Sequence, residues 1–227
     1  DRVVACPENV TDTTRCTRLG PVSTIEHLMS ALAGTGFTDC EIELSAPELP
    51  ALDGSALAYV QGLELAGCTI LGESTLEGPF ARVYLKESGH EIAIGAGRGW
   101  WRYLFVSDGP FPGDQDFEIE LTSDSYREEV APARTFGFED ELERIRAAGL
   151  AQGLDQSNAF LIGRDRYLSP GKFADEPVRH KLLDLIGDLY LSGVPPQLLN
   201  VVAERSGHAA NVRAAGKLRQ AVRIVSA

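Results

Sequence analysis

A nine-residue run late in the chain constrains its structure and chemistry more than any other feature. It reads His180-Lys181-Leu182-Leu183-Asp184-Leu185-Ile186-Gly187-Asp188, and its apolar spacing is typical of an amphipathic helix. Residues four apart in a helix leave the same face, so the His180 imidazole and the Asp184 carboxylate would lie one turn apart. Zinc accepts both ligand types. The run alone fits either two ligands of one metal ion or the charged face of an ordinary helix.

The composition of the whole chain excludes several classes of protein. At 227 residues the chain can form one large domain or two small ones. The net charge of −12 argues against nucleic acid and anionic membranes as partners. No apolar run reaches the roughly 20 residues that span a bilayer, and the start does not resemble a signal peptide. Since Cys6, Cys16, Cys40 and Cys68 match no metal or redox spacing, we expect a reduced, cytoplasmic protein, and a monomer.

Hydrophobic periodicity predicts a mixture of helices and short strands, which is an α+β fold. One helix would begin near Glu26, capped by Ser23 or Thr24. Gly34 and Gly36 would end it. Further helices are predicted over residues 57–65, 138–148, 178–191 and 209–222, a half-buried strand over 39–45, and short strands over 81–86, 90–94, 101–106, 117–121, 160–162 and 201–204.

The other histidines offer candidates for a third metal ligand and for acid–base chemistry. A catalytic zinc site needs three protein ligands and one open position. His27 follows Glu26 at a predicted helix start, where the carboxylate could take a proton from water; an acidic residue there also suits an ordinary surface helix. His208 lies between a predicted strand and helix, a common place for a catalytic side chain and equally for a histidine without a task. His90 receives no role.

Separated segments of the chain resemble one enzyme family. They read VSTIEHLMSALAGTGFTDCEIEL followed by PELPALDGSA, then ARTFGFEDEL, GLAQGLDQSNAFLIG, VRHKLLDLIGDLYLSG and RSGHAAN. In this order they are similar to the zinc-dependent UDP-3-O-acyl-N-acetylglucosamine deacetylases of lipid A synthesis, and the resemblance covers most of the chain. It implies two similar α/β-sandwich domains, at residues 1–76 and 77–227, with the active site between them. Each would have helices packed on a small, mostly antiparallel sheet.

The resemblance also implies a role for each matched position. The ligands of one zinc ion, for which iron or cobalt can substitute, would be His27, His180 and Asp184. Glu26 would be the general base for the attacking water. His208, oriented by Asp188, would protonate the departing amine. Three further residues would contact the acylated UDP-sugar: Thr135 would stabilise the oxyanion together with the metal, Lys181 would bind the polar head, and Phe136 would line the site.

Three differences from the family concern its first domain and its substrate. The family has additional strands before the segment that matches residues 1–20, so we expect the first domain to be incomplete at its N-terminus, with an unpaired sheet edge. Leu154 stands where the family has small residues along an acyl passage, and it would narrow this passage. The stretch 102–116 lacks the family's usual pattern. Trp100 and Trp101, just before it, fit sugar stacking or, more commonly, anchoring of a core strand.

These differences leave two alternatives to the lipid A precursor deacetylase. One is a related zinc deacetylase that acts on a different N-acetylated sugar. The other is a non-catalytic relative that binds zinc or a sugar nucleotide. The presence of Glu26, Thr135 and His208 argues against the second alternative, because a purely structural zinc site has four protein ligands and needs no base.

Overall fold

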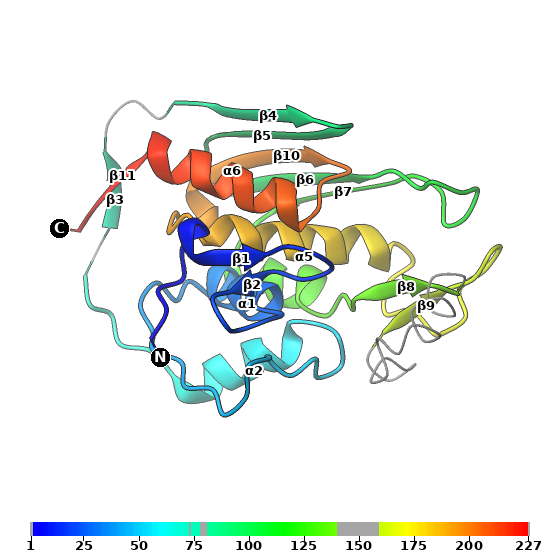
Figure 1. Cartoon of the computed structure of the whole chain (residues 1–227), viewed down its shortest axis with the longest axis horizontal. Coiled ribbons are helices and arrows are strands. Elements are labelled where there is room, and N and C mark those ends of the chain that lie inside the picture. Colours follow the sequence, from blue (N-terminus) through cyan, green and yellow to red (C-terminus); the bar gives the residue numbers. More distant parts are fainter. Residues whose placement is uncertain (1, 73, 78–80, 140–158, 227) are drawn as a thin grey trace.

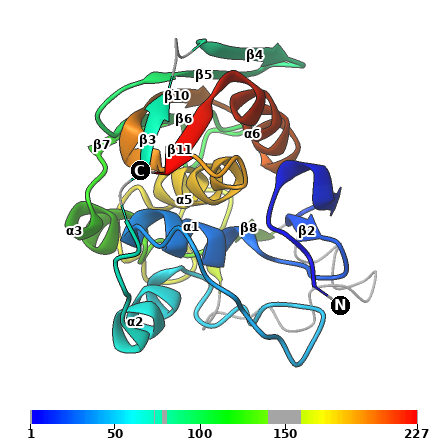
Figure 2. The same cartoon turned by 90° about the vertical axis from the view of Figure 1, so that its left-hand side faces the viewer.

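The computed structural model describes residues 2–72, 74–77, 81–139 and 159–226, and these form a layered α+β structure (Figure 1). A sheet forms one outer layer of the molecule. Helices α5 (Glu176–Tyr190) and α6 (His208–Ala221) lie beneath the sheet, α1 (Glu26–Thr35) lies beneath them, and α2 (Leu57–Ala66) forms the opposite outer layer, as Figure 2 shows. No helix in the described part of the chain is long and apolar enough to cross a membrane.

The large sheet has five strands, all of them close to the predicted positions. Their spatial order is β4 (Val83–Glu87), β5 (His90–Ala96), β10 (Leu199–Glu204), β6 (Trp100–Phe105) and β7 (Gln115–Glu120). β10 runs parallel to β6, and all other neighbours are antiparallel. Alternate residues are buried, as in Ile92 and Ile94 of β5, because α5 and α6 cover one face of the sheet. The chain passes from the end of β10 through a short loop to the start of α6, which packs beside α5.

Helices α1 and α5 pack against each other at the centre of the molecule. Gly34 was expected to end α1, but the helix continues to Thr35 and ends at Gly36, which adopts a left-handed conformation with φ of 79°. Gly34 is instead a packing position, since a Cβ atom there would lie 2.1 Å from the ring of Tyr126. That buried tyrosine donates a hydrogen bond to Ser30 of α1.

Two local predictions in the first 50 residues are wrong. Neither Ser23 nor Thr24 caps α1: the residue at the cap is Ile25, and the two hydroxyls bond to the 47–48 segment. The segment 39–45 forms no strand. Its alternating Ile42 and Leu44 are 45% and 39% exposed, because no strand among the described residues lies beside them. Alternation alone cannot supply that partner.

The remaining described elements are small. They are the pairs β1 (Val10–Asp12) with β2 (Arg18–Leu19), β3 (Ser74–Glu77) with β11 (Arg223–Ser226), and β8 (Phe136–Phe138) with β9 (Phe160–Ile162), the short helix α3 (Ser123–Ser125), a π-helical turn (Tyr126–Val130), and 3-10 turns at Pro7–Asn9 and Pro196–Leu198. Trp101 is fully buried on β6 and donates to the Pro196 carbonyl, so it anchors the core as predicted. Most of the helix predicted over 138–148, and Leu154, lie outside the described residues. The division into two domains stays a prediction.

Candidate metal centre and active site

Three buried side chains converge where the start of α1 meets the middle of α5. They are His27, His180 and Asp184, whose ligand atoms all lie within 4.8 Å of one another. The Asp184 Oδ1 atom is 3.4 Å from His180 Nε2 and 3.8 Å from His27 Nε2. The i,i+4 spacing in α5 aligns the pair within the helix, and packing of α1 against α5 brings in the third group. The spacing prediction for 180 and 184 is confirmed in geometry.

The protonation states of this cluster suit a metal ion. Burial lowers the pKa of His27 and lowers the pKa of His180 to about 3, so both imidazoles are neutral at pH 7. His180 donates from Nδ1 to the carbonyl of Ala133 at 3.1 Å, which leaves the Nε2 lone pair facing the cluster. Burial raises the pKa of Asp184, but the basic side chains around it, His180 and Lys181 foremost, together lower it below its usual range, so the carboxyl is ionised.

One atom of the cluster has no partner of its own. Asp184 Oδ1 is buried and receives no hydrogen bond from the described residues, whereas Oδ2 accepts from Lys181 Nζ at 3.0 Å. A buried carboxylate oxygen without a donor is costly unless a cation satisfies it. Two neutral imidazoles and one carboxylate are a donor set that zinc and related divalent ions accept. The residues therefore fit a bound metal ion.

Gly187 sets the distance between the two helices that carry the cluster. A Cβ atom at this position would lie 2.1 Å from the carbonyl oxygen of Glu26 and 3.0 Å from the amide of Ser30. Only the absence of a side chain allows α5 to approach the first turn of α1 so closely. The close approach brings His27, the residue after Glu26, to the Asp184 side of α5.

Glu26 lies next to the cluster as a buried carboxylate. Its side chain is buried, and Oε2 accepts a hydrogen bond from the amide of Thr17 at 2.9 Å. Burial raises the pKa of Glu26 to about 7, with Asp184 and Asp188 contributing in the same direction. A carboxyl group that titrates near neutral pH can both accept and release a proton there.

Half-buried His208 and buried Asp188 form a second pair, one turn along α5 from the metal cluster. His208 opens α6 and donates from Nδ1 to Asp188 Oδ2 at 2.9 Å. Burial disfavours the imidazolium, but Asp188 outweighs it and raises the pKa of His208 to about 9. This histidine is therefore protonated at pH 7 and able to donate a proton. The loop before it is held by Tyr103, which donates to the Ser206 carbonyl.

Lys181 and Phe136 lie on another side of the cluster. The Lys181 Nζ atom is 5.5 Å from the centre of the Phe136 ring, and that ring stands edge-on to His180 with 6.2 Å between centroids. Asp184 keeps the pKa of Lys181 above its usual range, although burial lowers it. The ammonium is therefore a fixed positive charge beside an aromatic wall.

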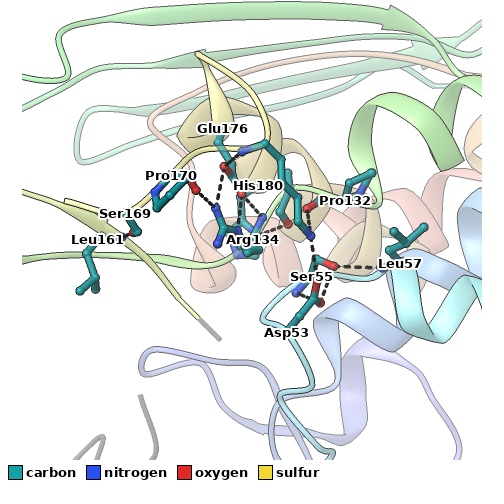
Figure 3. Close-up of polar contacts among 12 residues, drawn as sticks. Asp53, Ser55, Leu57, Pro132, Arg134, Leu161, Ser169, Pro170, Glu176 and His180 are labelled. Atoms are coloured by element: carbon teal, nitrogen blue, oxygen red, sulfur yellow. Dashed lines mark hydrogen bonds and ion pairs between the residues drawn. The ribbon is translucent and has the colours of Figure 1, made fainter. Parts of the chain in front are cut away.

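A buried ion pair fixes the segment that carries Ala133 and Thr135, as Figure 3 shows. Glu176, at the start of α5, accepts from Arg134 through the backbone amide at 3.0 Å and through Nε at 2.8 Å. It also accepts from the amide of Lys172 at 2.7 Å. Thr135 is half-buried, and its amide donates to the Gly54 carbonyl. The segment is thereby tied to α5 on one side and to the loop before α2 on the other.

An open groove of about 1300 Å³ follows the outer side of α1. Leu28, Met29 and Leu32 form its floor, and residues 38–47 form one wall. None of the nine predicted site residues lines it. The groove is therefore separate from the metal cluster.

Comparison with known proteins decides which family this arrangement belongs to. The family model LpxC, UDP-3-O-acyl N-acetylglycosamine deacetylase, matches residues 1–220. The chain belongs to this family. The match spans the region 102–116 that lacks the expected pattern, so this region lies within the family's domain.

Several curated members of the family are similar over most of the chain. A protein of Cellvibrio japonicus is 39% identical over 225 residues, which cover 93% of this chain and 73% of the relative. A protein of Anaeromyxobacter dehalogenans is 37% identical over 219 residues, covering 90% and 68%. One from Syntrophus aciditrophicus is 35% identical over 223 residues, covering 91% and 68%. All three are named UDP-3-O-acyl-N-acetylglucosamine deacetylase.

Contacts bring eight of the nine predicted site residues together in one region, and the ninth, Thr135, directly precedes Phe136 in the chain. Sequence reasoning missed four others that shape the site: Thr17, Arg134, Glu176 and Gly187. Glu176 carried a signal, since it precedes His180 by four residues and therefore shares its helix face. The other three gain their significance only from contacts across the fold.

Proposed function

We propose that this chain hydrolyses the acetamido group of UDP-3-O-acyl-N-acetylglucosamine, releasing acetate and the free 2-amino sugar nucleotide of lipid A synthesis. The observation that carries the proposal is the convergence of His27, His180 and Asp184 with an unpartnered Oδ1 atom. A buried carboxylate and a protonated imidazole accompany that cluster. Metal-assisted amide hydrolysis uses a metal ion, a base and an acid, and these residues can supply all three functions. The substrate in this proposal is the one that the names of the relatives give.

The metal is zinc in this proposal, with iron or cobalt able to replace it. A bound Zn²⁺ would lower the pKa of water to about 7 and polarise the amide carbonyl. The hydrogen bond from His180 to Ala133 holds its imidazole in the tautomer that presents Nε2 to the ion. Lys181 holds Asp184 from the opposite oxygen, which leaves Oδ1 for the metal.

Glu26 and His208 divide the proton transfers. Glu26 accepts a proton from the water whose oxygen bonds to the carbonyl carbon. His208 gives its proton to the amide nitrogen as the carbon–nitrogen bond breaks, so the products are acetate and the amine. The opposed environments of the two groups support this assignment: Glu26 has a pKa of about 7 and His208 one of about 9. Asp188 keeps the imidazolium of His208 paired.

Three residues complete the proposed site. Thr135 stabilises the oxyanion with its hydroxyl, Lys181 binds the polar part of the sugar nucleotide, and Phe136 lines the pocket. The two-domain division is part of the same proposal: residues 1–76 supply Glu26 and His27, and residues 77–227 supply the rest. Two different parts of the chain then close on one substrate.

The decisive experiment measures acetate release by the purified protein from three substrates. These are the 3-O-acylated UDP-N-acetylglucosamine, the same sugar nucleotide without the acyl chain, and free N-acetylglucosamine. We expect release from the acylated substrate, loss of release with a chelator, and recovery with Zn²⁺. Higher kcat/KM on either simpler sugar would establish the alternative of a deacetylase for another N-acetylated sugar, and no release from any of them would refute hydrolytic function.

A pair of glutamate variants tests the mechanism. Glu26→Gln preserves shape but cannot accept a proton, so kcat should fall by about 100-fold to 10,000-fold. Glu43→Gln, at an exposed glutamate, is the control and should keep the wild-type rate. Full activity of Glu26→Gln would rule out Glu26 as the base.

A further inference from the structure

Thr17 connects the two buried carboxylates that serve the proposed acid and base. It is fully buried just before β2. Its backbone amide donates to Glu26 Oε2 at 2.9 Å, and its hydroxyl donates to Asp188 Oδ1 at 2.6 Å. The amide of Ile25 in turn donates to the Thr17 carbonyl at 3.2 Å. One residue thus contacts both halves of the proton-transfer machinery.

The Thr17 hydroxyl completes the set of hydrogen bonds that Asp188 accepts. Asp188 is buried, with 1% exposure. Its Oδ2 atom accepts from His208 Nδ1 at 2.9 Å and from Asn211 Nδ2 at 3.0 Å. Oδ1 accepts from Thr17. Without the hydroxyl, Oδ1 of this buried carboxylate would lose the one donor that the described residues offer it, and the carboxylate would be free to rotate toward another donor.

The geometry points to Thr17 as a positioning residue that sets the orientation of Glu26 and of the Asp188–His208 pair relative to each other. This inference rests on the proposed deacetylase function. Thr17 acts indirectly in this inference, through Asp188 with its side chain and through Glu26 with its backbone. A β-branched side chain suits this role because it strongly restricts its own χ1 rotation. The hydroxyl is thereby held in line with Asp188.

The two contacts can be separated by mutation. Thr17→Val has nearly the same shape and keeps the amide that bonds to Glu26, but it cannot donate to Asp188. Thr17→Ser keeps the hydroxyl and removes only a methyl group. Thr35→Val is the matched control, because Thr35 also donates its hydroxyl, in this case to the Ala31 carbonyl at the far end of α1.

We expect Thr17→Val to lower kcat by about 10-fold to 100-fold, the usual effect of losing a partner that orients an active-site group. KM and the zinc content should stay within twofold of wild type. Thr17→Ser should recover most of kcat, and Thr35→Val should leave kcat unchanged. In proton NMR spectra, the His208 Nδ1–H resonance should shift in Thr17→Val and return in Thr17→Ser, which a loss of general stability would not produce.

Several results would overturn the inference while leaving the deacetylase function intact. These are wild-type kcat in Thr17→Val, no recovery in Thr17→Ser, or a loss of kcat that only follows a loss of zinc or of folded protein. If Thr17→Val does not fold, Thr17→Ala is measured against the same criteria. An inactive wild-type protein would instead refute the proposed function itself, so the two failures are distinguishable.

Discussion

Replacing Gly187 by alanine tests whether helix packing controls metal binding. The new Cβ atom would lie 2.1 Å from the Glu26 carbonyl oxygen, whereas non-bonded contacts of this kind do not fall below roughly 3 Å. The helices α1 and α5 must therefore separate by about 1 Å. Metal sites tolerate errors of only about 0.2 Å in ligand distance. His27 would then move out of bonding range of an ion held by α5.

The size of the effect follows from the number of ligands. Four-ligand zinc sites bind with about 10–16 kcal/mol, so one ligand contributes about 3 kcal/mol, and its loss weakens binding by about 100-fold. Overpacking costs folding stability about 1–3 kcal/mol, and the better helix propensity of alanine returns about 1 kcal/mol. The variant should therefore fold with a modestly lower Tm and a strongly reduced affinity for zinc.

Competition titration against a zinc chelator measures this affinity, with Tm recorded for the metal-loaded and chelator-treated protein. Gly216→Ala in α6 is the control, since its Cβ atom would meet only Pro7 Cβ at an ordinary 3.8 Å. It should bind zinc normally and gain up to about 1 kcal/mol in stability. Wild-type zinc affinity in Gly187→Ala would refute the link between helix spacing and the metal centre.

Three further predictions concern buried charges. Glu176→Gln should lower the free energy of unfolding by about 3–5 kcal/mol because it leaves Arg134 unpaired in the interior; Glu64→Gln, at a half-exposed ion pair, should cost less than about 1 kcal/mol in the same denaturant titration. The folded-state pKa of His208, raised to about 9, contributes stability below pH 6.5 that is lost as the pH rises toward 9; in the metal-free protein His208→Gln should flatten that decline, and an unchanged slope would contradict it. Asp184→Asn should abolish zinc binding, which elemental analysis of the purified protein measures. One zinc ion retained per chain would exclude Asp184 as a ligand.

The elements that local patterns specify were predictable from the sequence. The apolar periodicities of α1, α2, α5 and α6, and the short β-rich runs of the five-stranded sheet, lie close to their observed positions. The failures needed information from distant residues. The alternation in residues 39–45 has no strand beside it among the described residues, and the hydroxyls before α1 bond to the 47–48 segment rather than capping the helix.

The candidate site likewise contains residues that local spacing predicted and residues that only the fold brings in. The i,i+4 spacing predicted that His180 and Asp184 share one helix face. His27 was one of the histidines that could supply a third ligand, but no spacing rule could bring it to them, and the family resemblance was needed to choose it. Thr17 lies 171 positions before its partner Asp188, and nothing local distinguishes it from an ordinary threonine. Gly187 stands inside the most informative run of the chain, yet its significance depends on the carbonyl of another helix.

The pairing of α1 with α5 has a consequence for how the chain folds during its synthesis. The face of α1 that packs on α5, which includes Ser30 beside Gly187, has no α5 to cover it until about 150 further residues are translated. At about 5–20 residues per second this delay lasts roughly 8–30 seconds. An incomplete chain therefore exposes an apolar helix surface and a lone His27 on the ribosome. Slow translation should favour capture of the nascent chain by a chaperone or its aggregation, and the metal can be bound by its full set of ligands only after α5 has been translated.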